Sequence, residues 1–476
     1  MTMNTKKIVT ALAILVSVVM ILSSLAFFPL SGASQSTPEH IAASGSGSPS
    51  VGQTASAVKT VTVAGTASGT HLTASNVMSL LKQSGVPTQY AYLPNYAAAG
   101  IKSTGSSGVN APGYLVAPAP MGLASYGVTY NKTGSAVAYG YSTSSFKAVV
   151  NITSLQLENL LNDGPHEVSF QLNAILNGVT IQGVPGYEFW NQNVVFYSAR
   201  THELQLLDNV WNFSSPSGTL NAGSILSGNG TQVLPVYYYA VGPSFQTGVN
   251  GFTIALYLNS TTVNGNDAVY FNYSIQTGGK TTSGSYDEVI FNSNGGQPPT
   301  FSAPPAQYVV NGSMLSDLGF IPMDAEIMIG GPGGGSTATI TNITGFMQLY
   351  YENGTKYQVP ASAYDFGSET GETSSGVAVS STTVGTASLT TGPSFLYQLW
   401  NATINHVDKL VNASANTWNN TTYYNTPSTP LPSYTYSGAI SPSNAFLLVS
   451  ASNNSFNNYT AQWAPTNSNG HYSFTL

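Results

Sequence analysis

The pattern of hydrophobic and polar positions is that of β-strands, and it is clearest between Gly186 and Ser215. Aromatic and β-branched residues fill Tyr187 to Tyr197, which predicts one strand, and a second is predicted from about Leu204 to Phe213. Successive side chains in a strand point to opposite faces, so both faces of the first strand carry polar groups beside large aromatic ones. Buried polar groups are costly unless paired, so this stretch either lines a polar cleft or contains a buried hydrogen-bond network.

The same alternation recurs along the chain from Ala111 onward. Val168 to Leu176 and Val269 to Ile275 each place apolar residues on one face and polar residues on the other. Gly, Asn, Ser and Pro separate the predicted strands at short intervals, which is typical of an antiparallel sandwich. We therefore expect an all-β fold, an antiparallel and jelly-roll-like β-sandwich. Helices are predicted for Leu72 to Gln83, Leu155 to Leu161 and Leu396 to Val411.

Changes in pattern divide the chain into five segments. Residues 1–34 combine an early lysine pair, a long apolar run and small residues, which predicts a signal peptide, or an N-terminal anchor if it stays uncleaved. Residues 35–110 have the Ser/Gly-rich composition of a linker and a possible propeptide. We expect a first β-sandwich unit with the active site in residues 111–300. A second β unit in 301–401 and an Asn/Thr-rich extension in 402–476 follow.

The composition excludes several classes of protein. Charged residues make up 6% of the 476 positions, against about 25% in ordinary soluble domains. The net charge of −7 comes from 18 acids and 11 bases, which are too sparse to steer nucleic acid. Protonation of the carboxylates leaves only a modest positive charge, so the chain suits an acidic exterior. The absence of cysteine excludes disulfides and thiol catalysis.

The secretory signal predicts an extracellular protein, with membrane attachment only through an uncleaved N-terminal segment. Dense Asn-X-Ser/Thr sequons predict N-linked glycans, which would solubilise a surface that has little charge. The sequons include Asn131, Asn151, Asn229, Asn259, Asn342 and Asn412.

The chemistry available to the chain is that of carboxylates. The sequence has no Gly-X-Ser-X-Gly and no His-Glu-X-X-His motif, and its six histidines are scattered, so we expect neither a metal site nor a cofactor. Pro332 to Ser336 lacks the lysine of a phosphate loop and predicts a tight turn between strands. Asp and Glu have reference pKa values of about 3.9 and 4.3, so a carboxylate base works best in acid.

Seven segments stand out along the chain: GYLVAPAPMGLASYGV from Gly113, WNQNVV from Trp190, LLDNVWNFSS from Leu206, YDEVIFNS from Tyr286, PMDAEIMIGGPGGGS from Pro322, TGETSSGV from Thr370 and GPSFLYQLW from Gly392. Together, and in this order, they resemble the thermopsin family of archaeal acid proteases. The resemblance implies a secreted acid endopeptidase that acts on protein or peptide substrates.

The first candidate for the catalytic group is Gln192 paired with Glu288. The pair resembles the dyad of the glutamic acid-proteases, another all-β sandwich family, in which a strand Gln precedes a strand Glu. Glu288 would act as base on water and then as acid to the leaving nitrogen, while the Gln192 amide would hold the water and stabilise the oxyanion. Trp190 would wall the cleft, with Glu188 and Tyr286 as further substrate contacts.

The second candidate is a pair of carboxyls that share one proton, as in aspartic proteases. The Asp-Thr/Ser-Gly motif of pepsin-like enzymes is absent, and the nearest string is Glu369-Thr370-Gly371. A structural role stays open for Asp208, as a turn contact, and for Asp324 and Glu326, which share a strand face and could bind a cation or cap a loop. The candidates are Asp208, Asp287, Asp324 and Glu326.

A different class of function also fits the composition. Low charge, dense sequons and abundant tyrosine are equally typical of a non-catalytic, glycosylated β-sandwich protein of the cell surface, used for adhesion or carbohydrate binding. Convergence of carboxyl groups would favour the protease.

Overall fold

The computed structural model describes the middle of the chain almost continuously and the two ends in part. The described residues are 58–62, 74–93, 121–130, 136–138, 140–157, 166–214, 220–248, 251–295, 305–311, 323–360, 364–366, 370–383 and 385–392, with isolated strands between 416 and 475.

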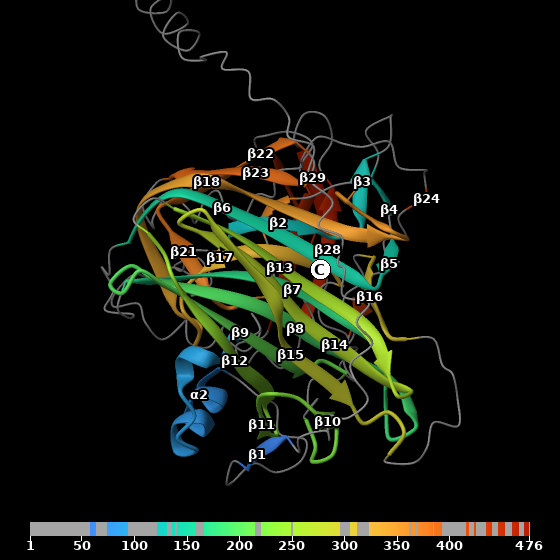
Figure 1. The fold of residues 1–476 in the computed structure, drawn as a ribbon. Coiled ribbons are helices and arrows are strands. Elements are labelled where there is room, and N and C mark those ends of the chain that lie inside the picture. Colours follow the sequence, from blue (N-terminus) through green and yellow to red (C-terminus); the bar gives the residue numbers. More distant parts are fainter. Residues whose placement is uncertain are drawn as a thin grey trace, which may run out of the picture. The chain divides into compact units, whose positions relative to one another are not determined.

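Two large, mainly antiparallel sheets form the fold, which confirms the all-β expectation (Figure 1). Sheet 1 runs in the order β1 (Lys59–Thr62), β11 (Thr231–Leu234), β12 (Tyr237–Gln246), β9 (Glu203–Asn212), β8 (Val184–Ser198), β7 (Glu167–Ile181), β17 (Ala325–Gly330), β2 (Met121–Ser125) and β20 (Tyr364–Phe366). Off this path lie β16 (Gln307–Val310), which pairs with β7, and β5 (Tyr141–Thr143), which pairs with β16.

Sheet 2 continues the same antiparallel pattern. Its order is β10 (Ile225–Ser227), β15 (Lys280–Phe291), β14 (Asn266–Thr277), β13 (Phe252–Val263), β6 (Ser145–Leu157), β18 (Thr337–Asn353), β23 (Thr386–Thr391) and β22 (Val377–Thr383), with β19 (Lys356–Gln358) and β21 (Thr373–Ser375) beside β18. The short strands outside both sheets are β3 (Val128–Tyr130), β4 (Ala136–Ala138), β24 (Asn416–Thr417), β25 (Tyr423–Tyr424), β26 (Thr435–Ala439), β27 (Phe446–Ser452), β28 (Tyr459–Pro465) and β29 (His471–Thr475).

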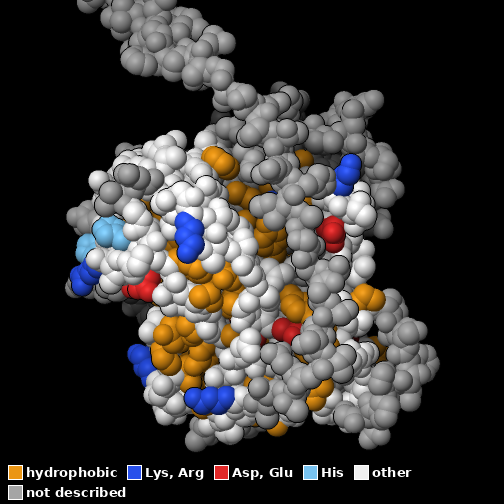
Figure 2. Space-filling model, in the orientation of Figure 1, with side chains coloured by type: hydrophobic (Ala, Val, Ile, Leu, Met, Phe, Trp, Pro, Cys, Tyr) orange, Lys and Arg blue, Asp and Glu red, His pale blue; other side chains and the backbone are white. Residues whose placement is uncertain are grey.

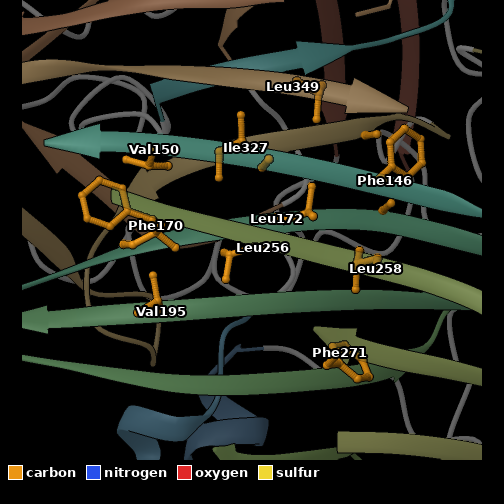
Figure 3. Close-up of a cluster of buried hydrophobic side chains, with 14 of the residues drawn as sticks. Phe146, Val150, Phe170, Leu172, Val195, Leu256, Leu258, Phe271, Ile327 and Leu349 are labelled. Carbon is orange, nitrogen blue, oxygen red and sulfur yellow. The ribbon is translucent and has the colours of Figure 1, made fainter. Parts of the chain in front are cut away.

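The hydrophobic core lies between the facing sides of the two sheets (Figure 3). Sheet 1 contributes Phe170 and Val195, and sheet 2 contributes Leu256 and Phe271, all of them fully buried. Each is two positions from further core residues on its strand, as the period of a strand requires. Burial of a side chain of this size contributes about 1.5–3 kcal/mol. The alternation in the sequence therefore produces the sandwich.

The helical predictions had mixed outcomes. The helix expected from Leu72 is confirmed as α2 (Ala74–Gln83), and a 3₁₀ turn, η1 (Thr88–Tyr90), follows it. The helix expected from Leu155 is wrong over its first three residues, which end β6 and pair with β18. A short apolar run fits either element, and here strand pairing across the sheet decides. Residues 158–161 and the helix expected over 396–411 lie outside the described residues.

Strands from residues 111–300 and from 301–401 share both sheets. In sheet 1, β17 lies between β7 and β2, and in sheet 2, β18 lies beside β6. The proline-rich segment near residue 300 therefore does not separate two independent sheets. In the described parts, no helix has the length and hydrophobicity to cross a membrane. Figure 2 shows charged side chains standing apart from one another among uncharged ones.

Candidate active site

The pair of strands expected between Gly186 and Ser215 is confirmed as β8 and β9. From Phe189 onward, both faces of β8 are largely buried. Asn193 points toward sheet 2, since its Nδ2 donates to the carbonyl oxygens of Tyr257 and Asn272 at 2.8 and 3.0 Å. Gln192, the preceding residue, therefore points away from sheet 2, onto the outer side of sheet 1. Of the two alternatives drawn from the sequence, the structure shows the buried hydrogen-bond network, and it shows one on each face of β8.

A hydrogen-bonded chain of amides crosses the outer side of sheet 1. The indole Nε1 of Trp211 donates to Gln192 Oε1 at 3.1 Å, and Gln192 Nε2 donates to Gln171 Oε1 at 3.3 Å. Gln171 Nε2 donates in turn to the hydroxyl of Ser169 at 3.0 Å. We call this surface the polar face. Its members are Gln171, Asn173, Gln192, Asn209, Glu326, Thr370 and Glu372, all fully buried.

Glu372 joins the polar face through Thr370. Thr370 Oγ1 lies 2.9 Å from Gln171 Oε1 and 2.5 Å from Glu372 Oε2, yet a hydroxyl has one proton to donate. Both contacts are satisfied when the Glu372 carboxyl is protonated, because it then donates to Thr370, which donates to Gln171. Burial raises the pKa of Glu372, and hydrogen bonds from Thr370 and the backbone partly offset this rise. The arrangement therefore favours the protonated, uncharged form of the Glu372 carboxyl at acidic pH.

Glu326 lies at the other end of the same network. Its Oε1 accepts a hydrogen bond of 2.9 Å from Asn173 Nδ2, and Asn173 also reaches Gln171 Oε1 at 3.5 Å. The carboxyls of Glu326 and Glu372 are thus joined through three uncharged side chains. Asp324, immediately before β17, is also fully buried.

A segment from the N-terminal part of the chain covers the polar face. The backbone N–H of Leu93 donates to Glu372 Oε1 at 3.0 Å, and that of Tyr92 donates to Asn209 Oδ1 at 2.8 Å. Glu372 is thereby in direct contact with a peptide nitrogen.

A second carboxyl group, the inter-sheet pair, consists of Asp208 on β9 and Asp287 on β15. The two carboxyls are in hydrogen-bond contact and almost without exposed surface. Burial, together with the neighbouring Asp287, raises the pKa of Asp208 well above its usual range. Burial also raises the pKa of Asp287. Two such carboxyls share one proton in acid.

The inter-sheet pair is held by several donors. Asp287 accepts from the hydroxyl of Tyr238 at 2.7 Å and from the backbone N–H groups of Asn229 and Glu288 at 2.7 and 2.8 Å. Asp208 Oδ1 accepts from the Ala240 N–H at 3.0 Å. Asp208 Oδ2 receives no N–H or O–H donor among the described residues, so a proton shared with Asp287 is its available hydrogen bond.

The structure does not bring Gln192 and Glu288 together, which corrects that predicted pairing. Asp287 faces inward to Asp208, so the adjacent Glu288 faces the outer side of sheet 2. Gln192 faces the outer side of sheet 1. The whole sandwich therefore separates the two side chains.

The predicted substrate contacts divide between the two groups. Trp190 is fully buried on the outer side of sheet 1 and stacks on Phe213, with ring centroids 5.3 Å apart. Glu188 lies two positions before Trp190 on β8, and its Oε1 accepts a hydrogen bond of 2.9 Å from Asn177 Nδ2 on β7. Tyr286 instead faces the inter-sheet pair, and its hydroxyl lies 2.9 Å from Asn193 Oδ1 and 2.6 Å from the Leu207 carbonyl oxygen, either of which can accept its single proton.

Sequence reasoning missed Glu372 and Gln171 as site residues. Glu372 lies in the family-like segment TGETSSGV, one residue after the string Glu369-Thr370-Gly371 that was compared with aspartic proteases. That position was the available signal. Nothing in the sequence distinguishes Gln171 from other polar residues on an alternating strand. Its contact with Thr370 depends on the packing of distant segments.

Buried carboxyls supported by amides on an all-β sandwich are the groups that a carboxyl-dependent hydrolase requires. Comparison with known proteins agrees with this class. Residues 109–377 match the model of the Thermopsin family. Thermopsin from Sulfolobus acidocaldarius is 32% identical over 305 residues, which cover 60% of this chain and 84% of that protein. The chain belongs to the thermopsin family and is an acid protease. Of the two classes of function that the sequence left open, family membership favours the enzyme.

Proposed function

We propose that this chain is a secreted acid endopeptidase whose catalytic carboxyls lie on the polar face of sheet 1. One observation carries the proposal: Glu372 Oε1 accepts a hydrogen bond from the backbone nitrogen of Leu93, while Oε2 contacts Thr370. Glu372 therefore lies within reach of a peptide nitrogen, and it can protonate a leaving amine once its proton moves from Oε2, where it faces Thr370, to Oε1. We assign Glu372 as the general acid and Glu326 as the general base.

The reaction follows from these roles. Glu326 takes a proton from water as the water oxygen attacks the peptide carbonyl carbon, giving a tetrahedral intermediate. Glu372 gives its proton to the peptide nitrogen, the C–N bond breaks, and a carboxylic acid and an amine are released. The intervening residues Asn173, Gln171 and Thr370 position the two carboxyls, and after the products leave, Glu326 gives its proton to water while Glu372 takes one from water.

The acidic working range follows from the state of Glu372. A general acid must hold its proton, so its activity is present below its pKa and is lost as the pH rises through that pKa. Burial raises the pKa of Glu372, which widens the acidic range in which it can act. The base must be ionised, so activity also falls at the lowest pH.

The inter-sheet pair is the second candidate for the catalytic group, since two carboxyls sharing a proton are the device of aspartic proteases. Its position weakens this role. Both Asp287 oxygens are already held by donors from the protein, and the pair lies between the sheets. A peptide could reach it only if the sheets or the covering residue Asn229 moved.

Three variants of the full chain test the assignment, each compared with wild type on acid-denatured protein substrate across about pH 2 to 7. We expect Glu372→Gln and Glu326→Gln to lose about 10²-fold or more in kcat while retaining the wild-type circular dichroism spectrum. Asp208→Asn should keep most of its activity. Loss of activity in folded Asp208→Asn, with Glu372→Gln unaffected, would move the active site to the inter-sheet pair.

Secretion and glycosylation are separate parts of the proposal. The apolar N-terminal segment and the sequons support them. Mass spectrometry of the protein from its native host, with and without glycosidase, measures both the mature N-terminus and the glycan mass. An intracellular, unprocessed chain without glycans would contradict this part.

A further inference from the structure

The strap, residues 86–93, lies on the polar face and is bound there through its backbone. Asn209 holds two of its peptide groups with one side chain: Oδ1 accepts from the Tyr92 N–H at 2.8 Å, and Nδ2 donates to the Tyr90 carbonyl at 2.9 Å. This is the hydrogen-bond pattern that a neighbouring β-strand offers to every second residue. Ala91, between the two, has the extended conformation with φ −100° and ψ 103°.

Three further contacts also bind backbone atoms of the strap. Glu372 Oε1 accepts from the Leu93 N–H, and the N–H of Gly371 donates to the Leu93 carbonyl at 2.7 Å. The N–H of Gly334 donates to the Ala91 carbonyl at 2.6 Å. Recognition through main-chain hydrogen bonds is independent of sequence, as a site for extended peptides requires.

The side chains of the strap fill apolar positions on the same surface. Tyr92 packs with Val194 and Leu207. Ala91 and Leu93 belong to a cluster that includes both tryptophans of the β8–β9 pair. All three strap side chains are fully buried. Main-chain hydrogen bonds with side-chain pockets are how a peptide docks on a sheet surface.

The strap lies outside the region that matches the family, which begins at residue 109. Upstream elements attach it to the sandwich. The strand β1 pairs in parallel with β11 (Figure 1). Val77 and Leu81 of α2 pack in the same cluster as Leu93.

We propose that the strap occupies the peptide-binding site of its own chain and inhibits the protease, leaving it a residual activity, until the segment is removed. The inference rests on the proposed function for the identity of the site, but the binding of the strap can be tested without activity. An extended peptide bound in its place would lay one peptide nitrogen on Glu372 and two peptide groups on Asn209. The site therefore takes extended polypeptide as its ligand.

The test uses the full chain with a site-specific protease sequence inserted in residues 97–108, which precede the family match. After cutting at neutral pH, the N-terminal fragment is removed by size exclusion in acid, and its absence is checked by mass spectrometry. A tethered segment has an effective concentration in the millimolar range, so we expect activity to rise at least about tenfold on removal. Uncut chain, treated identically, is the control.

A synthetic peptide of residues 86–93, extended by two residues at each end, is then returned to the fragment-free protein. We expect it to bind, by fluorescence anisotropy, and to inhibit competitively. The same peptide with a methyl group on the Leu93 nitrogen cannot donate to Glu372 and should bind at least about tenfold more weakly. A scrambled peptide controls for general hydrophobicity.

The outcomes separate the two proposals. Folded, fragment-free protein that binds the peptide but hydrolyses nothing would refute the protease site and leave the strap supported. Equal activity before and after removal, or activity that the peptide does not inhibit, would overturn the proposed inhibition by the strap. The proposed protease site would be unaffected. Equal binding of the methylated and unmethylated peptides would also overturn the proposed inhibition, since the main-chain contacts would then be unimportant.

Discussion

Asp208 shows how one residue makes the stability of the folded protein depend on acidic pH. In the folded state it has no exposed surface, and burial together with Asp287 raises its pKa. A group whose pKa is raised on folding stabilises the folded state fully below its unfolded pKa of about 3.9. That contribution is lost as the pH rises through the folded pKa, because ionisation is then easier in the unfolded chain. Asp287 and Glu372, whose pKa values are raised in the same direction, act with the same sign.

The first prediction concerns Asp208→Asn, which removes one ionisable group and keeps the shape. We expect the melting temperature of wild type to fall as the pH rises from about 3 to 7, and the fall to be smaller in the variant. Each unit by which a pKa is raised costs about 1.4 kcal/mol once the group ionises in the fold. Thermal unfolding at several pH values measures this. Glu288→Gln, one residue from Asp287 on the outer side of sheet 2, is the control, and equal slopes for all three proteins would contradict the assignment.

The second prediction concerns Thr370, the hydroxyl between Gln171 and Glu372. Thr370→Val keeps the volume but breaks both contacts, so Glu372 loses its orientation, and we expect kcat to fall about 10-fold or more with a smaller change in KM. Thr370→Ser retains the hydroxyl and should retain most of the rate. If the serine and valine variants lost the same activity, the hydroxyl would have no part in positioning Glu372.

At the residue scale, the types of residue at the site were predicted more accurately than the contacts between them. Asp208 and Asp287 were both named as members of a carboxyl pair, and they meet. Gln192 and Glu288 were paired by analogy, and the sandwich separates them. The difference lies in which sheet each strand joins and which way the strand faces, and neither is local information.

Among the elements, the glycine loop between β17 and β18 has a function that its turn prediction did not include. Residues 331–336 make the expected tight turn, with positive φ at Gly333, Gly334 and Gly335. They also meet the strap, because a Cβ at Gly333 would lie 2.5 Å from the carbonyl oxygen of Gln89. The absence of a side chain allows the two backbones to approach.

The third prediction uses this approach. Gly333→Ala adds a methyl group against the strap, while Gly354→Ala adds one at a similar positive φ, +70° against +55°, with nothing within 4 Å. The two share the conformational cost of about 1–2 kcal/mol, so their difference isolates the contact. We expect Gly333→Ala to loosen the strap, to expose Lys82 in the last turn of the preceding helix α2 to trypsin, and to raise the activity of the uncut chain.

The outcome that would count against this prediction is equal trypsin sensitivity of the two alanine variants. Both are compared with wild type at the same pH, and the fragment masses identify the cut site.

The elements themselves were largely predictable. The β8–β9 pair and α2 were expected from alternation and from helical pattern, and both are present. The three residues from Leu155 were not, because a short apolar run is compatible with either helix or strand and pairing with β18 decided the matter. The meeting of the strap with Glu372 joins residues 279 positions apart, and no local pattern reports such a contact.

For the whole molecule, 29 charged residues in 476, the 18 acids and 11 bases together, leave little for salt to screen. Stability must then come mainly from apolar burial and uncharged hydrogen bonds. The fourth prediction is that the melting temperature at about pH 5 changes by no more than about 2 °C between 0.05 and 0.5 M sodium chloride. Differential scanning calorimetry measures it. A change of about 10 °C would show that ion pairs carry a large share of the stability.

The distance along the chain between the strap and its partners also orders events during synthesis. The strap leaves the ribosome long before Gly371 and Glu372 do, so the site has no complete set of groups while most of the chain is being made. When the last of these residues emerges, the segment that covers the site is already present on the same molecule. Completion of the site and the presence of its cover thus coincide during synthesis, so a strap that inhibits would leave no interval in which the protease is open inside the producing cell.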